Sequence, residues 1–480
     1  MIRPVIRPVM RPLARAIQEV AGAFNPAALF AANERGIWLD ASDLSTIYQD
    51  AAGTTPGALE QPVGLWEDKS RGRAQGSELV TNGSFATDTD WTKGAGWAIG
   101  SGVATATTSS ADLSQNIGAT VGRWYIVRLT VTRSAGSLTV IIGNAASTTP
   151  TISESGTYTL KILAAGTGTS LLLRGSGFSG TVDNVSVVSY AGNHAYQTTS
   201  ASRPVLSARY NLLVGTATLA TQSVTTLAAS YTLTFTGSGT VTLSGTATGV
   251  KSAGTNVFTA TAGTLTLTVS GSVRRADLRL TADANSRIPA YQRVDTSTSY
   301  DSAGFPRFLR IDATDDFLQT ASVDPGTDKV FVCAGVTKVS DAATQIVVEL
   351  SSNTATKTNA FLLISTTAPA IAFGSKGTTY KESTKAVPAG PVTAVASLLG
   401  DIGAPSVSGR VNGDASTPTT TTQGTAANYG PHPIYIGARA GTSLRLNNGR
   451  IYPMVICFKA VTAGEIAATE AWVNARTRAY

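Results

Sequence analysis

Four residues in the stretch DTDWTKG have the side chains that sugar recognition uses. An aromatic ring stacks on the C–H face of a sugar, while carboxylates and amines take its hydroxyl groups. Trp91 supplies the ring and stands among Asp88, Asp90 and Lys93 in a polar stretch. This pattern predicts an exposed carbohydrate-binding platform in a loop.

A second group of this kind, weaker than the first, stands near the C-terminus. Tyr429, His432 and Tyr435 follow one another closely in YGPHPIYIG. Trp97 and Trp124 have the same ring chemistry but lie in strand-like apolar runs, where we expect them to be buried.

The sequence offers little for catalysis. Of its 2 histidines, neither stands in a metal-ligand pattern or beside a Ser/Asp constellation. Asp315 and Asp316 are adjacent, so on a strand they would point to opposite faces and make a poor acid/base pair. The phosphate-binding, dinucleotide-binding and zinc-knuckle patterns are missing as well. We therefore expect no enzymatic activity and no cofactor.

Composition favours a large β protein. The 480 residues are 42% apolar but only 14% charged, and 47 glycines accompany many threonines and serines. Such residues suit short strands joined by tight turns. The net charge of +7 is concentrated partly near the N-terminus, so no nucleic-acid-binding surface is expected. No apolar run approaches the ~20 residues of a membrane span.

The 2 cysteines, Cys333 and Cys457, lie in strand-like runs. They are either buried free thiols or, if their strands are neighbours, a possible disulfide pair.

The chain opens with MIRPVIRPVMRP, a basic arm with a proline at every fourth residue. Proline at this spacing excludes a helix over residues 1–12, and the missing apolar stretch argues against a secretory signal. Residues 13–24 have the period of a short amphipathic helix. We expect this segment to attach the protein to an assembly or to oligomerise it. The residues expected to do so are Arg3, Arg7, Arg11, Arg15, Leu13, Ile17, Val20 and Phe24.

Periodicity predicts an all-β chain of several antiparallel β-sandwich or jelly-roll domains, with an extended N-terminal arm and a short N-terminal helix. Residues 76–190 contain seven or more strand-like runs, with GSGFSG (175–180) interpreted as turns. Residues 211–285 alternate strictly, with Tyr231, Leu233 and Phe235 on one face. The last unit closes with a helix that Thr462 and Glu465 can cap.

Two stretches resemble the opening and the end of concanavalin A-like (laminin G-type) sandwiches: FLRIDATDDFLQT (308–320) and GRIYPMVICFKAVTAGEIAATEAWVNAR (449–476). Tailed-bacteriophage virion proteins of the tail-fibre or appendage type have a segment directly before this sandwich, which we call the lead-in. Three stretches here resemble it: RGIWLDASDLSTIYQDAAGTTP and QPVGLWEDKSRG (within 35–72), and GNHAYQTTSASRPVLSAR (192–209). In those proteins the pieces run together. Here residues 76–190 separate them.

The resemblance implies one discontinuous sandwich that carries two inserted domains, because insertion at loop tips costs little. Its parts are 27–75, 191–210 and 301–480, behind the arm and helix at 1–26. The insert 76–190 resembles carbohydrate-binding-module jelly rolls in ELVTNGSF and GTVDNVSVVS, and the insert 211–300 resembles a small β-sandwich of phage tail proteins. The jelly-roll family often holds a structural calcium ion, which here implies Asn82, Ser84 and Asp183 as ligands.

The leading hypothesis is a structural or adhesive virion protein: a tail fibre, a tail-tip or baseplate appendage, or a head decoration. It would reside on the phage particle, and in the host cytoplasm during assembly. Its partners would be other virion proteins through the arm, further copies of itself, with a trimer favoured, and a host surface glycan. The alternative is a bacterial secreted or surface carbohydrate-binding adhesin. A glycosidase or depolymerase with an unrecognised site is the third.

Overall fold

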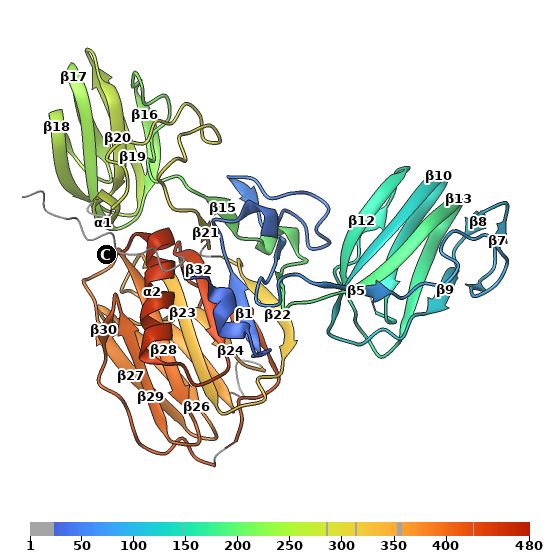
Figure 1. The fold of residues 1–480 in the computed structure, drawn as a ribbon. Helices are drawn as coiled ribbons and strands as arrows, with labels where there is room; N and C mark the ends of the chain where they lie inside the picture. The colour runs from blue at the N-terminus through green and yellow to red at the C-terminus, as the bar shows by residue number, and fades with distance from the viewer. Residues whose placement is uncertain (1–23, 146, 285–286, 313, 353–357, 426) are drawn as a thin grey trace, which may run out of the picture.

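The computed structural model describes residues 24–480, apart from 146, 285–286, 313, 353–357 and 426. The arm and nearly all of the predicted helix 13–24 lie outside the described residues. The described chain forms four antiparallel sheets (Figure 1). Short helices accompany them, so the predicted all-β class is confirmed. Among the described residues, no helix combines the length and the apolar character that crossing a membrane requires.

Two nine-stranded sheets pack face to face as the core sandwich. Each takes strands from three separated parts of the chain. The first sheet contains β1 (Gly36–Leu39), β3 (Gln61–Pro62), β15 (Val205–Ser207), β21 (Phe308–Arg310), β23 (Lys329–Lys338), β28 (Val392–Asp401), β29 (Ser406–Val411), β30 (Asp414–Ala415) and β32 (Arg450–Cys457). The second contains β2 (Ile47–Tyr48), β4 (Leu65–Trp66), β14 (Ala195–Tyr196), β22 (Leu318–Val323), β24 (Gln345–Leu350), β25 (Ala360–Ser365), β26 (Ala370–Lys376), β27 (Tyr380–Ala386) and β31 (His432–Ile436).

Helix α2 (Ala463–Thr477) covers the outer face of the first sheet, next to β23 and β28 (Figure 1). Thr462 and Glu465 form the predicted capping box. The ring of Trp472 meets that of Trp38 edge-on, with centroids 5.7 Å apart. The 3-10 helices η1 (Pro26–Phe30), η2 (Leu44–Thr46) and η3 (Ser200–Ser202) complete this domain. Phe24 packs against the same apolar cluster as α2.

The two cysteines lie on neighbouring strands, β23 and β32, but remain free thiols. Cys333 stands opposite Val455 rather than opposite Cys457. Both thiols are buried, and burial raises the pKa of Cys457 to about 12.

The jelly roll inserted after residue 75 is built on two long strands, β10 (Trp124–Ile142) and β13 (Ser170–Tyr190). We expected turns within both, including one at GSGFSG, and this was wrong. The strands continue through β-bulges, where an extra residue bends a strand without ending it. Gly136 (φ +67°) lies at such a bulge, and a Cβ there would be 2.1 Å from the Gly177 oxygen. The other strands are β5 (Gln75–Glu78), β6 (Thr92–Lys93), β7 (Trp97–Gly100), β8 (Val103–Ser109), β9 (Asp112–Asn116), β11 (Thr151–Ile152) and β12 (Gly156–Leu163).

The second inserted domain has the predicted period of two. Tyr231, Leu233 and Phe235 are buried on one face of β17 (Ala229–Gly245), beside Leu265 and Leu267. Threonines and serines occupy much of the other face. The remaining elements are β16 (Gln222–Thr226), β18 (Gly249–Ala260), β19 (Gly263–Ser270), β20 (Arg274–Leu280) and the short helix α1 (Thr281–Ala284).

Candidate functional site

The two halves of the lead-in, separated in sequence by the jelly roll, meet where that domain joins the core sandwich. The buried carboxylate of Asp68 accepts hydrogen bonds from the backbone N–H groups of Trp38, Ser70 and Asn193, each at 2.8 Å. In return, the Asp68 N–H donates to Nδ1 of His194 at 2.9 Å. We call Asp68, Asn193 and His194 the clasp, because they tie the segment before the insert to the segment after it.

His194 is structural in this arrangement. Burial, and then the positive charges of Lys161 and Arg73, lower the pKa of its imidazole to about 3. The ring is therefore neutral, as an acceptor at Nδ1 requires. The centroid of its ring lies 4.6 Å from that of Tyr190 in β13, so the clasp also contacts the jelly roll.

A buried ionic group docks the jelly roll beside the clasp. Glu67, which is fully buried, pairs with Lys161 of β12 at 2.7 Å and with Arg73 at 2.9 Å. The Lys161 ammonium also lies 3.2 Å from the centroid of the Tyr48 ring. The backbone N–H of Lys161 donates to the Ala52 oxygen at 2.8 Å. Apolar side chains around Leu65 and Trp124 fill the rest of this contact.

A cleft of about 660 Å³ opens at this junction, within the roughly 300–1,000 Å³ of small-molecule sites. Both domains line it, and we call it the junction cleft. Its lining residues are Arg35, Arg71, Val121, Gly122, Arg123, Trp124, Ser189, Tyr190, Ala191, Gly192, Asn193, Ser322, Val323 and Asp324.

The junction cleft is basic. Among the described residues, it holds three arginines and one carboxylate, that of Asp324. Arg35 pairs with Asp324 and also donates to its backbone oxygen at 2.9 Å. Arg71 donates to the side-chain and backbone oxygens of Asn33, at 3.1 and 2.8 Å. The exposed guanidinium of Arg123 has no hydrogen-bond or ion-pair partner among the described residues.

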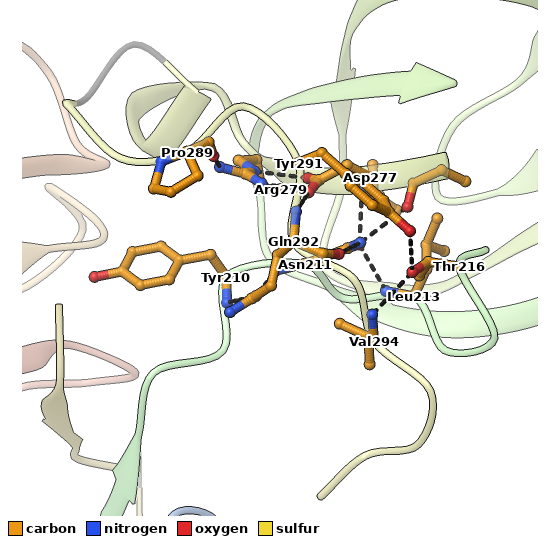
Figure 2. A network of polar contacts seen from close by, with 12 residues as sticks. Tyr210, Asn211, Leu213, Thr216, Asp277, Arg279, Pro289, Tyr291, Gln292 and Val294 are labelled. Carbon is orange, nitrogen blue, oxygen red and sulfur yellow. Dashed lines mark hydrogen bonds and ion pairs between the residues drawn. The ribbon is translucent and has the colours of Figure 1, made fainter. Parts of the chain in front are cut away.

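A comparable polar network fixes the root of the second inserted domain (Figure 2). The Asn211 amide bridges the backbone oxygens of Ala276 and Gln292, each at 2.9 Å. The Gln292 side chain accepts from the backbone N–H of Asn211 at 3.0 Å. Asp283 of α1 forms a two-pronged ion pair with Arg450 of β32, at 2.8 and 2.9 Å, which ties this domain to the core sandwich.

The structure does not place Trp91 as an exposed platform, contrary to our prediction. The side chain is 7% exposed and packs 5.2 Å from the Phe85 ring, between centroids. Its Nε1 donates to the Asn82 oxygen at 3.1 Å, so the polar edge turns inward too. Asp88 and Lys93 pair with each other. The Asp90 carboxylate accepts from Thr89.

The second predicted group does not form a platform either. Tyr429 is buried in the core sandwich, where its hydroxyl bonds that of Ser375 at 2.5 Å. Tyr435 is buried on β31. His432 is half-buried, with Nε2 3.3 Å from the Thr358 oxygen.

The residues proposed for calcium make local hydrogen bonds. The Asn82 amide donates to the oxygens of Thr87 and Thr89, at 2.7 and 3.0 Å. The Asp183 carboxylate accepts from the backbone and side chain of Asn184. Ser84 is exposed.

An acidic cluster lies elsewhere, in the DATDD turn. Asp312, Asp315 and Asp316 each offer a carboxylate oxygen within 4.8 Å of the others. Oδ1 of Asp312 accepts from the backbone N–H groups of Thr314, Asp315 and Asp316, which closes the turn. Burial, opposed by a backbone hydrogen bond and reinforced by the charges of Asp312 and Asp315, raises the pKa of Asp316 to about 6. These hydrogen bonds give the cluster the arrangement of a turn.

The predicted assembly residues Arg3, Arg7, Leu13, Ile17 and their neighbours lie outside the described residues. Phe24 is the exception and is half-buried. The cleft arginines, in contrast, were missed. Arg35 and Arg71 belong to the two lead-in stretches before the jelly roll, which was the only signal for them, and Arg123 belongs to the jelly roll.

Comparison with known proteins gives no family. No family model matches the sequence, and no curated protein matches it. Among solved structures, the CBM40 module of the Ruminococcus gnavus IT-sialidase has a TM-score of 0.27 at 17% identity, over 34% of this chain and 95% of that one. The receptor-binding domain of botulinum neurotoxin mosaic serotype C/D has a TM-score of 0.26 at 8% identity, over 32% and 40%.

A third match, Trypanosoma rangeli sialidase, has a TM-score of 0.28 at 11% identity, over 34% of this chain and 27% of that one. The chain thus spans less than half of the toxin domain and of this sialidase. Scores this low support no conclusion about family or function.

Proposed function

We propose that this chain is a structural and adhesive protein of a tailed-bacteriophage particle, which presents β-sandwich domains to the surface of the host cell. One observation carries the proposal. The pieces of the lead-in, contiguous in the virion proteins that the sequence resembles, are rejoined in space by the clasp of Asp68, Asn193 and His194. The chain thus leaves the core sandwich for the jelly roll and returns to it at one point, and the two lead-in segments adjoin each other there.

The architecture suits presentation. Each inserted domain has its own apolar core, and the core sandwich has another. The jelly roll projects to one side of the core sandwich and the second insert to another (Figure 1). Weak contacts of such outer domains gain strength from copy number, so a symmetric oligomer, with a trimer favoured, belongs to the proposal. Glycans of the host surface are the proposed target, and the chain acts without catalysis.

Attachment to the particle is assigned to the arm and the segment 13–24. A proline-stiffened arm is already extended and loses little entropy when it docks. Its arginines can pair with acidic groups of a neighbouring virion protein, and its apolar residues can fill a groove.

Adsorption of particles to host cells tests this function. Particles produced without the chain should adsorb poorly, and supplying the full chain during assembly should restore adsorption. A chain that lacks residues 1–24 should fold its β domains but fail to enter particles, while Arg174→Ala, an exposed change on the jelly roll, should enter normally. Normal incorporation of the truncated chain would refute the role of the arm. Native protein in the culture medium, free of particles, would favour a secreted adhesin instead.

A further inference from the structure

We propose that the junction cleft binds an acidic saccharide, a sugar that carries a carboxylate or a phosphate group. The inference rests on the proposed function in one respect, that the outer domains contact host glycans. It names the place and the chemistry of that contact. The place differs from both aromatic groups that the sequence indicated.

Charge is the first argument. Three guanidinium groups and one carboxylate give the cleft a net charge of +2. Arg35 is neutralised by Asp324, so the surplus belongs to Arg71 and Arg123. Arg71 is oriented by its two hydrogen bonds to Asn33, which leaves further N–H donors of its five available. The planar fork of an arginine matches the paired oxygens of a carboxylate or phosphate.

The rest of the wall suits the body of a sugar. Ser189, Asn193 and Ser322 offer neutral donors and acceptors for hydroxyl groups. Val121, 50% exposed at the rim, offers an apolar contact for C–H groups. Such mixed polar and small apolar surroundings fit a hydrated, hydroxyl-rich ligand better than an apolar one.

The clasp holds part of the wall in place before any ligand arrives. Asn193 is fixed twice: its N–H donates to Asp68 at 2.8 Å, and its Nδ2 donates to the Gly36 oxygen at 2.9 Å. The Glu67–Lys161 pair holds the jelly-roll side of the cleft against the core side. Groups that are already ordered cost less entropy on binding. The cleft is therefore a product of the insertion, and it exists only while the two domains are docked.

Isothermal titration calorimetry of the full chain tests the site with three probes: tetragalacturonate for the carboxylate, a phosphorylated pentamannose for the phosphate, and neutral maltotetraose. At least one acidic probe should bind and the neutral probe should not. Binding should weaken as salt rises from 50 to 200 mM, since the contact is ionic. Arg123→Ala should weaken it about tenfold, the effect of losing one charge-assisted hydrogen-bonding group.

Arg174→Ala is the matched control, because it removes an exposed jelly-roll arginine that pairs with Asp112 away from the cleft. It should leave the affinity unchanged. Failure of both acidic probes to bind, equal binding of maltotetraose, or equal affinities of the Arg123 and Arg174 variants would overturn the proposal. Arg123 is exposed, so unchanged melting of its variant separates lost binding from lost folding.

The outcome is distinct from that of the proposed function. Particles that carry Arg123→Ala and adsorb as well as the wild type would refute the cleft and leave the virion role standing. A chain absent from particles that still binds an acidic probe through Arg123 would refute the virion role and leave the cleft standing.

Discussion

Replacing Lys161 by methionine should loosen the jelly roll from the core sandwich without unfolding either. The change keeps the length and apolar stem of the side chain but removes its charge. Glu67 then stays buried with Arg73 as its remaining ion-pair partner, and the Tyr48 ring loses the ammonium 3.2 Å from its centroid.

The expected cost follows from the burial of the pair. Removing one partner of a buried ion pair costs roughly 3–5 kcal/mol, because the other charge is left uncompensated. Arg73 still compensates Glu67 in part, so we expect about 3 kcal/mol for Lys161→Met. Lys93→Met is the matched control on the same domain. Its pair with Asp88 is solvent-exposed, and such pairs contribute roughly 0–1 kcal/mol.

Amide hydrogen exchange at residue 161 measures the docking directly. Its N–H donates to the Ala52 oxygen of the core sandwich, so it exchanges when the domains separate. A cost of about 3 kcal/mol corresponds to exchange roughly 100-fold faster in Lys161→Met. Amides inside the jelly roll, such as that of Leu173, should keep their protection, because the domain has its own core.

A double-mutant cycle makes the reasoning refutable. Lys161→Met combined with Glu67→Gln should cost less than the sum of the two single changes, with a coupling of about 2 kcal/mol between residues in direct contact. Unchanged exchange at residue 161 in the single variant, or a coupling near zero, would show that the ion pair does not dock the domain.

Three further results are expected. Arg450→Met should lower the free energy of unfolding in denaturant by about 3 kcal/mol, because it leaves the buried Asp283 without this cation. The pKa of Asp316 is raised in the folded state, so folding favours its protonated form: its stabilising contribution is full below about pH 4 and is lost as pH rises through about 6. When the free energy of unfolding is measured against pH, Asp316→Asn should therefore remove the decrease that this carboxyl group causes between about pH 4 and about pH 6. Cys333 and Cys457 should not react with a thiol reagent in the native protein and should both react in denaturant, because both are buried and burial raises the pKa of their thiols.

Local patterns in the sequence predicted the parts of the fold that local physics decides. The alternation around Tyr231 and Leu233 predicted a buried face because side chains of a strand alternate between its two sides. Thr462 and Glu465 predicted the start of α2 because capping involves only neighbouring residues. The glycines of GSGFSG misled, since glycine serves a bulge as well as a turn.

The candidate site could not be predicted in the same way. Trp91 stands in a polar stretch, yet its ring folds back onto Phe85, and only tertiary packing decides that. The junction cleft combines Arg35 and Arg71 with Arg123, which reaches them only because the jelly roll docks on the core sandwich. The sequence indicated part of the clasp. Asp68 and His194 belong to two stretches that resemble one contiguous lead-in, so their segments were expected to lie together, and they do.

Quantitative mass spectrometry of particles purified from the strain that encodes the chain tests the central claim most directly. The account predicts the full chain in the particles, at a fixed copy number relative to the major capsid protein, and its removal from them when residues 1–24 are deleted. Absence of the chain from intact, infectious particles would contradict the account.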